Sequence, residues 1–247
     1  MGLRDPGEPE YPRTLEEMKA ACDRLVDALR TELGERLIGV LLCGSWARGE
    51  ARPLESDIDA AVIVDTVDSA VIVALRRCWE ASGFGPANVY GADEVPLLAR
   101  DGLEQFTSNA VVLWGANPFA PPTREDFARD LARAAESIAR DARCVLIYPW
   151  LTPELGVKDL RGALGKYNLR WALRCLAAYR TGAFPHNQAD MREKLMGSPE
   201  ELLIDWCDHL TDEELGGRAE EVAFQLNEFT RLWLSEIAPS LIKSDGC

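Results

Sequence analysis

The stretch LLCGSWARGEARPLESDIDAAVIV, residues 41–64, decides how the first half of this chain folds. One apolar run ends at Gly44-Ser45, and a second begins directly after Asp57 and Asp59. Short apolar runs that are bounded by turn residues are typical of buried strands. The sequence therefore predicts strands over 36–43 and 56–64, joined through a turn and a short helix.

The two aspartates add nothing to the packing of a core strand, so they indicate chemistry. Alternation along a strand places Asp57 and Asp59 on one face, with Cβ atoms about 6 to 7 Å apart. Two carboxylates so placed repel each other unless a cation lies between them. Mg²⁺ accepts one or two carboxylates and keeps places for phosphate oxygens. Nearby, exposed N–H groups at Gly44 and the Ser45 hydroxyl can hold a phosphate, which indicates a site for a nucleoside triphosphate and its metal.

The segment GSWARGEARPLESDID resembles the signature of the DNA polymerase β-like nucleotidyltransferase superfamily, in which Gly-Ser precedes Asp-x-Asp by about ten residues. Gly-Ser-x-Ala-Arg-Gly with Ser-Asp-Ile-Asp is similar to the antibiotic-modifying and minimal members. The order of strands and helices extends the resemblance over roughly residues 15 to 115. More loosely, ALGKYNLRWALRCLAAYRTGAFP resembles the helical second domain of aminoglycoside adenylyltransferases.

The resemblance implies a role for each matching residue. Asp57 and Asp59 are the expected catalytic Mg²⁺ ligands, and the donor is a nucleoside triphosphate, most often ATP in this group. Arg48 would neutralise phosphate or would simply be solvated, and Ser56 would contact the nucleotide or only cap the turn into the strand. The nucleotide-binding candidates in the motif are Gly44, Ser45, Arg48 and Ser56.

The chain departs from the family where a third carboxylate is expected on the next strand. In GPANVYGADEV that position falls on Asn88. An amide ligates metal weakly and cannot take a proton near neutral pH. Asp93 or Glu94 would substitute if the strand runs further, and otherwise these two are turn residues before Pro96.

The rest of the chain predicts an α+β protein with two domains. Residues 1–117 would form a small mixed-sheet nucleotidyltransferase domain with an N-terminal helix, and residues 118–247 an all-helical bundle. Thr14 and Glu17 predict the start of the first helix. A helix over 66–83 and strands in ANVYGAD and NAVVLWG complete the first domain, and about five helices follow the proline-rich stretch 116–126.

The helical half offers one basic stripe. Lys166, Arg170 and Arg174 stand four residues apart, within about 80° of arc on a helix. The stripe would either close over the triphosphate tail or form a solvated face paired with acids. Lys166 and Arg170 are therefore further candidates for binding the nucleotide.

The net charge of the chain limits the kinds of molecule that it is expected to bind. The 247 residues carry a formal net charge of −14, which disfavours binding to duplex nucleic acid and suits small cationic acceptors such as aminoglycosides. The seven cysteines show no metal-binding spacing, and the start of the chain shows no secretory signal, so we expect a cytoplasmic protein outside the membrane. Two alternatives stay open: a protein-modifying, antitoxin-like transferase, and a degenerate nucleotide-binding module.

Overall fold

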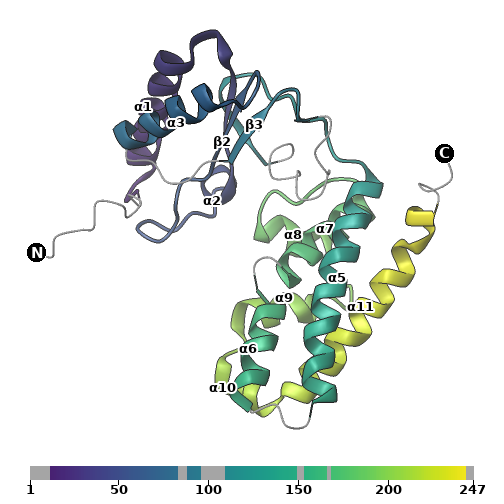
Figure 1. Ribbon diagram of the computed structural model, residues 1–247. Coiled ribbons are helices and arrows are strands. Elements are labelled where there is room, and N and C mark those ends of the chain that lie inside the picture. The colour runs from purple at the N-terminus through teal and green to yellow at the C-terminus, as the bar shows by residue number, and fades with distance from the viewer. Residues whose placement is uncertain (1–11, 83–87, 96–108, 149–152, 166–167, 243–247) are drawn as a thin grey trace, which may run out of the picture. The chain divides into compact units, whose positions relative to one another are not determined.

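The computed structural model describes residues 12–82, 88–95, 109–148, 153–165 and 168–242 (Figure 1). The chain divides into two compact units, Met1–Pro121 and Pro122–Cys247. Each unit has its own hydrophobic core and is described by itself.

A mixed four-stranded sheet forms the centre of the first unit. Its strands are β1 (Leu37–Leu42), β2 (Ala60–Val64), β3 (Asn88–Gly91) and β4 (Val111–Gly115), in the order β3-β2-β1-β4. β1 pairs antiparallel with β2 and with β4, while β2 and β3 run parallel. The mixed sheet and the α+β class are as the sequence predicts.

Two helices cover one face of this sheet: α1 (Leu15–Leu33) and α3 (Ser69–Ser82) (Figure 1). Alternate residues of the central strands, among them Val40 and Val62, pack against Leu25 of α1 and Leu75 of α3. The remaining residues of the strands face the other way and form a smaller cluster with Phe119 of the proline-rich segment. Both faces of the sheet thus pack apolar side chains, which leaves the ends of the strands for the site.

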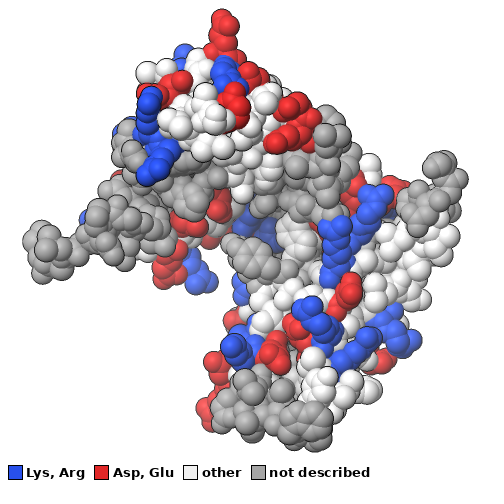
Figure 2. Space-filling model, in the orientation of Figure 1, with Lys and Arg blue, Asp and Glu red and all other residues white. Residues whose placement is uncertain are grey.

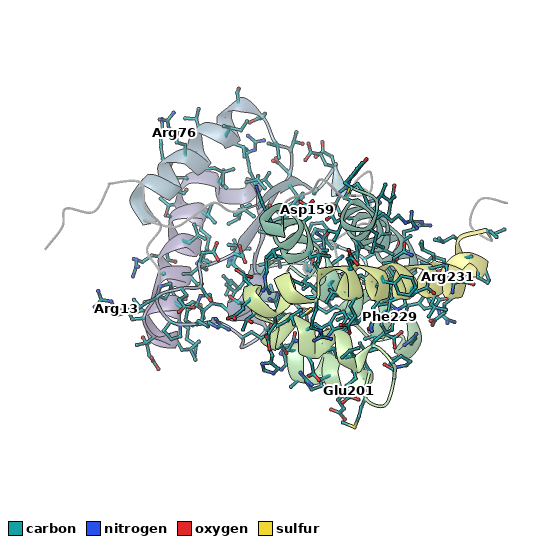
Figure 3. The ribbon with its side chains drawn as sticks, turned by 90° about the horizontal axis from the view of Figure 1, so that it is seen from below. Arg13, Arg76, Asp159, Glu201, Phe229 and Arg231 are labelled. Atoms are coloured by element: carbon teal, nitrogen blue, oxygen red, sulfur yellow. The ribbon has the colours of Figure 1, made fainter. Side chains whose placement is uncertain are left out.

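Side-chain capping fixes where α1 begins. The Thr14 hydroxyl accepts a hydrogen bond from the Glu17 N–H at 3.1 Å. The Glu17 carboxylate accepts from the N–H of Arg13, the residue before the cap that is labelled in Figure 3, at 2.7 Å. The predicted cap is therefore present, with its return bond shifted by one residue. The short 3₁₀ helix Gly34–Arg36 then leads into β1.

The second unit is helical throughout its described residues. Its longest helices, α5 (Arg124–Ile147) and α11 (Ala219–Ile242), pack along each other, and α7 (Leu169–Thr181) packs on α5 (Figure 1). Phe229 of α11, which is labelled in Figure 3, contacts Trp233 one turn later, with ring centroids 6.1 Å apart. The shorter helices are α6 (Pro153–Ala163), α8 (Gln188–Lys194), α9 (Glu201–His209) and α10 (Asp212–Gly217).

The surface carries charges of both signs, and the described cysteines are unpaired with one another, as the composition and cysteine spacing predict. Acidic and basic side chains are intermingled on the face shown in Figure 2. Across the part of the chain that the structure describes, the six cysteines are free thiols, and no helix is long and apolar enough to cross a bilayer.

Candidate active site

The Gly-Ser turn follows β1 and opens the short helix α2 (Gly44–Ala47). Gly44 has a φ of +69°, a left-handed conformation that side-chain-bearing residues rarely adopt. Ser45 is half-buried, and its carbonyl accepts a hydrogen bond from the Glu50 N–H at 2.9 Å. The turn is therefore a closed loop in which glycine is required at its first position.

Asp59 lies directly against this turn. A Cβ built on Gly44 would stand 2.8 Å from Asp59 Cγ and 2.9 Å from its Cβ, and would overlap the carboxylate oxygen. The Cys43 N–H also donates to the Asp59 carbonyl at 2.7 Å. The two halves of the motif, fifteen residues apart in the chain between Gly44 and Asp59, thus meet at one end of the β1–β2 pair.

The thiol of Cys43 lies beside the Gly44 turn and close to Asp59. Burial and, to a smaller extent, the nearby negative charge of Asp59 raise the pKa of Cys43 to about 12. This thiol therefore stays protonated at neutral pH and acts as a small apolar side chain beneath the turn.

Asp57 does not belong to a strand, which corrects the sequence prediction. We expected β2 to begin at Ser56, whereas it begins at Ala60. Asp57 is exposed, and its carboxylate makes no hydrogen bond or ion pair with another described residue. Its position therefore depends on the loop before β2, and strand alternation does not fix it.

The neighbouring candidates have specific partners. Arg48 is mostly buried, with 13% of its side chain exposed, and its Nε donates to Glu50 Oε2 at 2.7 Å. The Ser56 hydroxyl accepts from the Arg52 N–H at 2.8 Å. Arg48 is thus held beside the turn, and the Ser56 side chain closes the loop as one of its two predicted roles requires.

Asn88 opens β3, next to the site. In the parallel register Asn88 stands opposite Ala61, and Tyr90 stands opposite Ile63. Asn88 therefore shares a sheet face with Ala61, and strand spacing and rise put its Cα about 8 Å from that of Asp59. An amide lies where the resemblance implies a third carboxylate.

The fold does not bring Asp93 and Glu94 close to Asn88 and Asp59. β3 ends at Gly91, which pairs with Val64 at the opposite end of β2 from Asp59. Asp93 lies in the turn that follows, and the Glu94 carboxylate accepts from the Gly91 N–H at 2.9 Å. Both acids are turn residues because the strand ends before it reaches them.

The basic stripe belongs to the helical unit. Lys166 lies outside the described residues. Arg170, on α7, donates to the Cys207 carbonyl at 2.6 Å and pairs with Asp208 at 3.3 Å. Arg174 is buried. Arg170 therefore has a structural role between α7 and α9, whatever else it does.

The donor set fits a hard divalent cation that also binds phosphate. Across the described ranges no group of three or more His, Cys, Asp or Glu side chains could hold a metal ion. Asp57 and Asp59 would nevertheless suit Mg²⁺ bound with a nucleotide, because Mg²⁺ then takes one or two carboxylates and keeps places for phosphate oxygens. Sequence reasoning missed Glu50 and Trp46, which brace the turn. In the sequence, only their position inside the motif could have indicated this role.

A comparison with known protein families matches the part of the chain that contains the motif. Residues 22–111 match the family model described as a nucleotidyltransferase domain. The match covers both strands of the motif and Asn88, and it supports the predicted resemblance and a transferase of the nucleotidyltransferase type. No curated protein matches the chain.

A solved structure is similar to the chain as well. It is spectinomycin adenyltransferase AAD(9) from Enterococcus faecialis with ATP and spectinomycin, at 14% identity and a TM-score of 0.43. The similarity covers 86% of this chain and 99% of that one.

Proposed function

We propose that the protein moves a nucleoside monophosphate, AMP in the first instance, from Mg²⁺-bound nucleoside triphosphate to a hydroxyl of a small cationic acceptor such as an aminoglycoside. Pyrophosphate leaves. The observation that carries the proposal is the contact of Asp59 with Gly44, which joins a carboxylate to the phosphate-binding turn.

Each residue then has a task. Asp57 and Asp59 would hold Mg²⁺, which supplies positive charge against the triphosphate when it is bound. Gly44 and Ser45 would hold the β and γ phosphates beside that pair. Arg48, fixed by Glu50, would add a positive charge at the edge of the turn. Together these groups favour the charge that develops on the leaving pyrophosphate.

The acidic balance supports a cationic acceptor. A net charge of −14 raises the local concentration of cations around the molecule and repels polyanions. Amino groups on the acceptor would supply the complementary charge. The nucleotide is an anion, like the protein, so its binding would depend on the Mg²⁺ ion and on Arg48 rather than on the net charge.

The test is pyrophosphate release from ATP and other nucleoside triphosphates, with and without Mg²⁺, against a panel of aminoglycosides and other aminated sugars. Asp57→Asn and Asp59→Asn should each lower turnover by about two orders of magnitude or more, because each removes a charge that faces the metal. The matched control is Asp65→Asn, at the far end of β2, where the carboxylate pairs with Arg36 at 3.0 Å. Full activity in both site variants would contradict the assignment.

Asn88 favours a second candidate, a module that binds nucleotide without efficient transfer. Without a carboxylate at that position, the described residues of β3 offer no base for the acceptor hydroxyl. Such a module would bind Mg²⁺–ATP and release no pyrophosphate with any acceptor. A protein-modifying, antitoxin-like transferase would instead label a tyrosine or serine of a partner protein, and radiolabelled ATP would reveal it on a gel.

A further inference from the structure

The position of Asp57 poses a physical problem that β2 does not solve. The β1–β2 ladder ends at the pair Leu42–Ala60, and the Cys43–Asp59 bond extends it by one residue. Asp57 lies two residues beyond that bond, with an exposed side chain. Without a brace, the repulsion between the two carboxylates would move Asp57 away, and metal binding would have to bring it back.

Trp46 supplies such a brace. Its indole Nε1 donates a hydrogen bond to the Ser56 carbonyl at 3.3 Å. That carbonyl belongs to the peptide group that joins Ser56 to Asp57. One hydrogen bond therefore connects α2, which carries the Gly-Ser turn, to the backbone directly before the first carboxylate.

The indole ring is itself anchored. Trp46 is half-buried and packs against the core cluster between the sheet and helices α1 and α3. A side chain that is held by packing and donates from one edge fixes the group that accepts the bond. The brace thus extends from the core of the unit to the loop.

The far side of the loop is closed by backbone contacts. The Ser56 N–H donates to the Arg52 carbonyl at 2.9 Å, and the Ser56 hydroxyl accepts from the Arg52 N–H. Between these residues Leu54 has a φ of +68°, which is costly for a side-chain-bearing residue. A strained turn persists only where its surroundings hold it, and here Trp46 holds the end nearest Asp57.

We propose that Trp46 is a positioning residue: its indole N–H holds the Ser56–Asp57 peptide so that Asp57 faces the same cation as Asp59 before the metal and nucleotide arrive. This inference rests on the proposed function of the carboxylate pair. Loss of a hydrogen bond that orients a metal ligand typically weakens metal binding about 10- to 100-fold.

The test compares Trp46→Phe with Trp114→Phe. Trp114, on β4, packs against the same core cluster and, among the described residues, makes no hydrogen bond to the loop before β2. Its substitution therefore costs similar packing and one contact with Arg30, whose guanidinium lies 5.8 Å from the Trp114 ring centroid. Two readouts are used: hydrogen exchange of the amides of residues 52 and 54–58 in the nucleotide-free protein, and calorimetric titration with ATP at fixed Mg²⁺. Trp46→Phe should speed the exchange and weaken Mg²⁺–ATP binding about 10-fold, while Trp114→Phe leaves both near wild type.

The outcomes separate the inference from the proposed function. Exchange and affinity equal in the two variants, with wild type binding Mg²⁺–ATP, would overturn the role of Trp46 alone. A wild type that does not bind Mg²⁺–ATP would overturn the proposed function and the positioning role with it. If Trp46→Phe fails to fold, a tryptophan analogue with sulfur in place of the indole N–H removes the donor and keeps the ring, and the same results are required of it.

Discussion

Two glycines of the motif share one backbone conformation and differ in their surroundings. Gly44 and Gly49 have φ values of +69° and +68°. A Cβ on Gly49 would meet nothing within 4 Å, whereas a Cβ on Gly44 would overlap the Asp59 carboxylate. The pair therefore separates the cost of the left-handed conformation from the cost of displacing Asp59.

We predict that Gly49→Ala lowers the free energy of unfolding by about 1 to 2 kcal/mol through backbone strain and leaves nucleotide affinity nearly unchanged. Gly44→Ala should cost more stability and should also abolish Mg²⁺–ATP binding, because the carboxylate must move. Urea unfolding and calorimetry measure the two effects. Equal affinity in both variants would show that the close approach of Gly44 to Asp59 has no functional meaning.

Asn88 leads to a second prediction at the scale of single residues. A positioned base contributes typically about two to four orders of magnitude to a proton transfer. We therefore expect slow turnover in the wild type and an increase of about tenfold or more in Asn88→Glu. Asp93→Asn is the control and should change little, since Asp93 lies beyond the opposite end of β3. Pyrophosphate release decides between them, and loss of activity in Asp93→Asn would show that the third strand has another role.

At this scale the sequence predicted which residues meet and not how they are held. Gly44 and Asp59 could be assigned to one site because their residue types have no use in a core strand. The braces could not, because Trp46 and Glu50 act through hydrogen bonds that follow from loop geometry rather than from a pattern. Arg170 shows the limit of spacing: the sequence placed it on a basic stripe, whereas its partner Asp208 is 38 residues away in the chain.

At the scale of elements, the strands were predicted in the right order and near their observed places, because short apolar runs bounded by turn residues are typical of buried strands. The start of β2 was placed four residues early, since Ser56–Asp59 alternate like a strand although the ladder ends at Ala60. The helical half was predicted to hold about five helices, and its described residues form seven. Short helices such as α8 and α10 have too few turns for a clear apolar period.

A buried ion pair joins three elements of the helical unit. Glu200, just before α9, is 4% exposed, and its carboxylate accepts from Arg180 of α7 at 3.1 Å and from the Trp233 indole of α11 at 3.0 Å. Burial by itself would raise the pKa of Glu200, but these hydrogen bonds outweigh it and lower the pKa to about 2.

This shift has a definite sign. An unfolded glutamate titrates near pH 4.3, whereas Glu200 in the folded protein titrates at about 2. The ionised Glu200 therefore stabilises the fold fully above pH 4.3, and this stabilisation is lost as the pH falls toward 2. We predict that Glu200→Gln costs roughly 2 to 3 kcal/mol of unfolding free energy at pH 7 and progressively less below pH 4. Urea unfolding of both proteins between these pH values measures the difference.

The matched control is Glu221→Gln. Glu221 pairs with Arg218 at 2.8 Å, but its side chain is 51% exposed. Solvent screens such a pair, so this substitution should change the stability little at any pH. A Glu200 variant that behaves like the Glu221 variant would mean that the network joining α7, α9 and α11 contributes no more than a surface contact.

At the scale of the whole molecule, the two units have different tasks in the proposed reaction. The first contains the Gly-Ser and Asp-x-Asp motif with its own core, and the second contributes helices in which arginines pair with acids of the same unit, as Arg180 and Arg192 illustrate. Pairing within the unit leaves the overall excess of acid unchanged. The net charge of −14 is therefore a property of the molecule that no single residue explains.

That charge leads to a prediction about salt. If attraction to the acidic protein helps to bind a cationic acceptor, the dissociation constant of an aminoglycoside should rise several-fold between about 0.1 M and 1 M salt, as the Debye length falls from about 10 Å to about 3 Å. An N-acetylated form of the same aminoglycoside, which keeps the hydroxyls and loses the charges, should bind more weakly and with little dependence on salt. Calorimetric titrations of both ligands in the presence of Mg²⁺ and a non-hydrolysable ATP analogue measure the two slopes. Equal slopes would contradict a cationic acceptor and would favour a neutral sugar or a protein hydroxyl, because only the charged amines distinguish the two ligands.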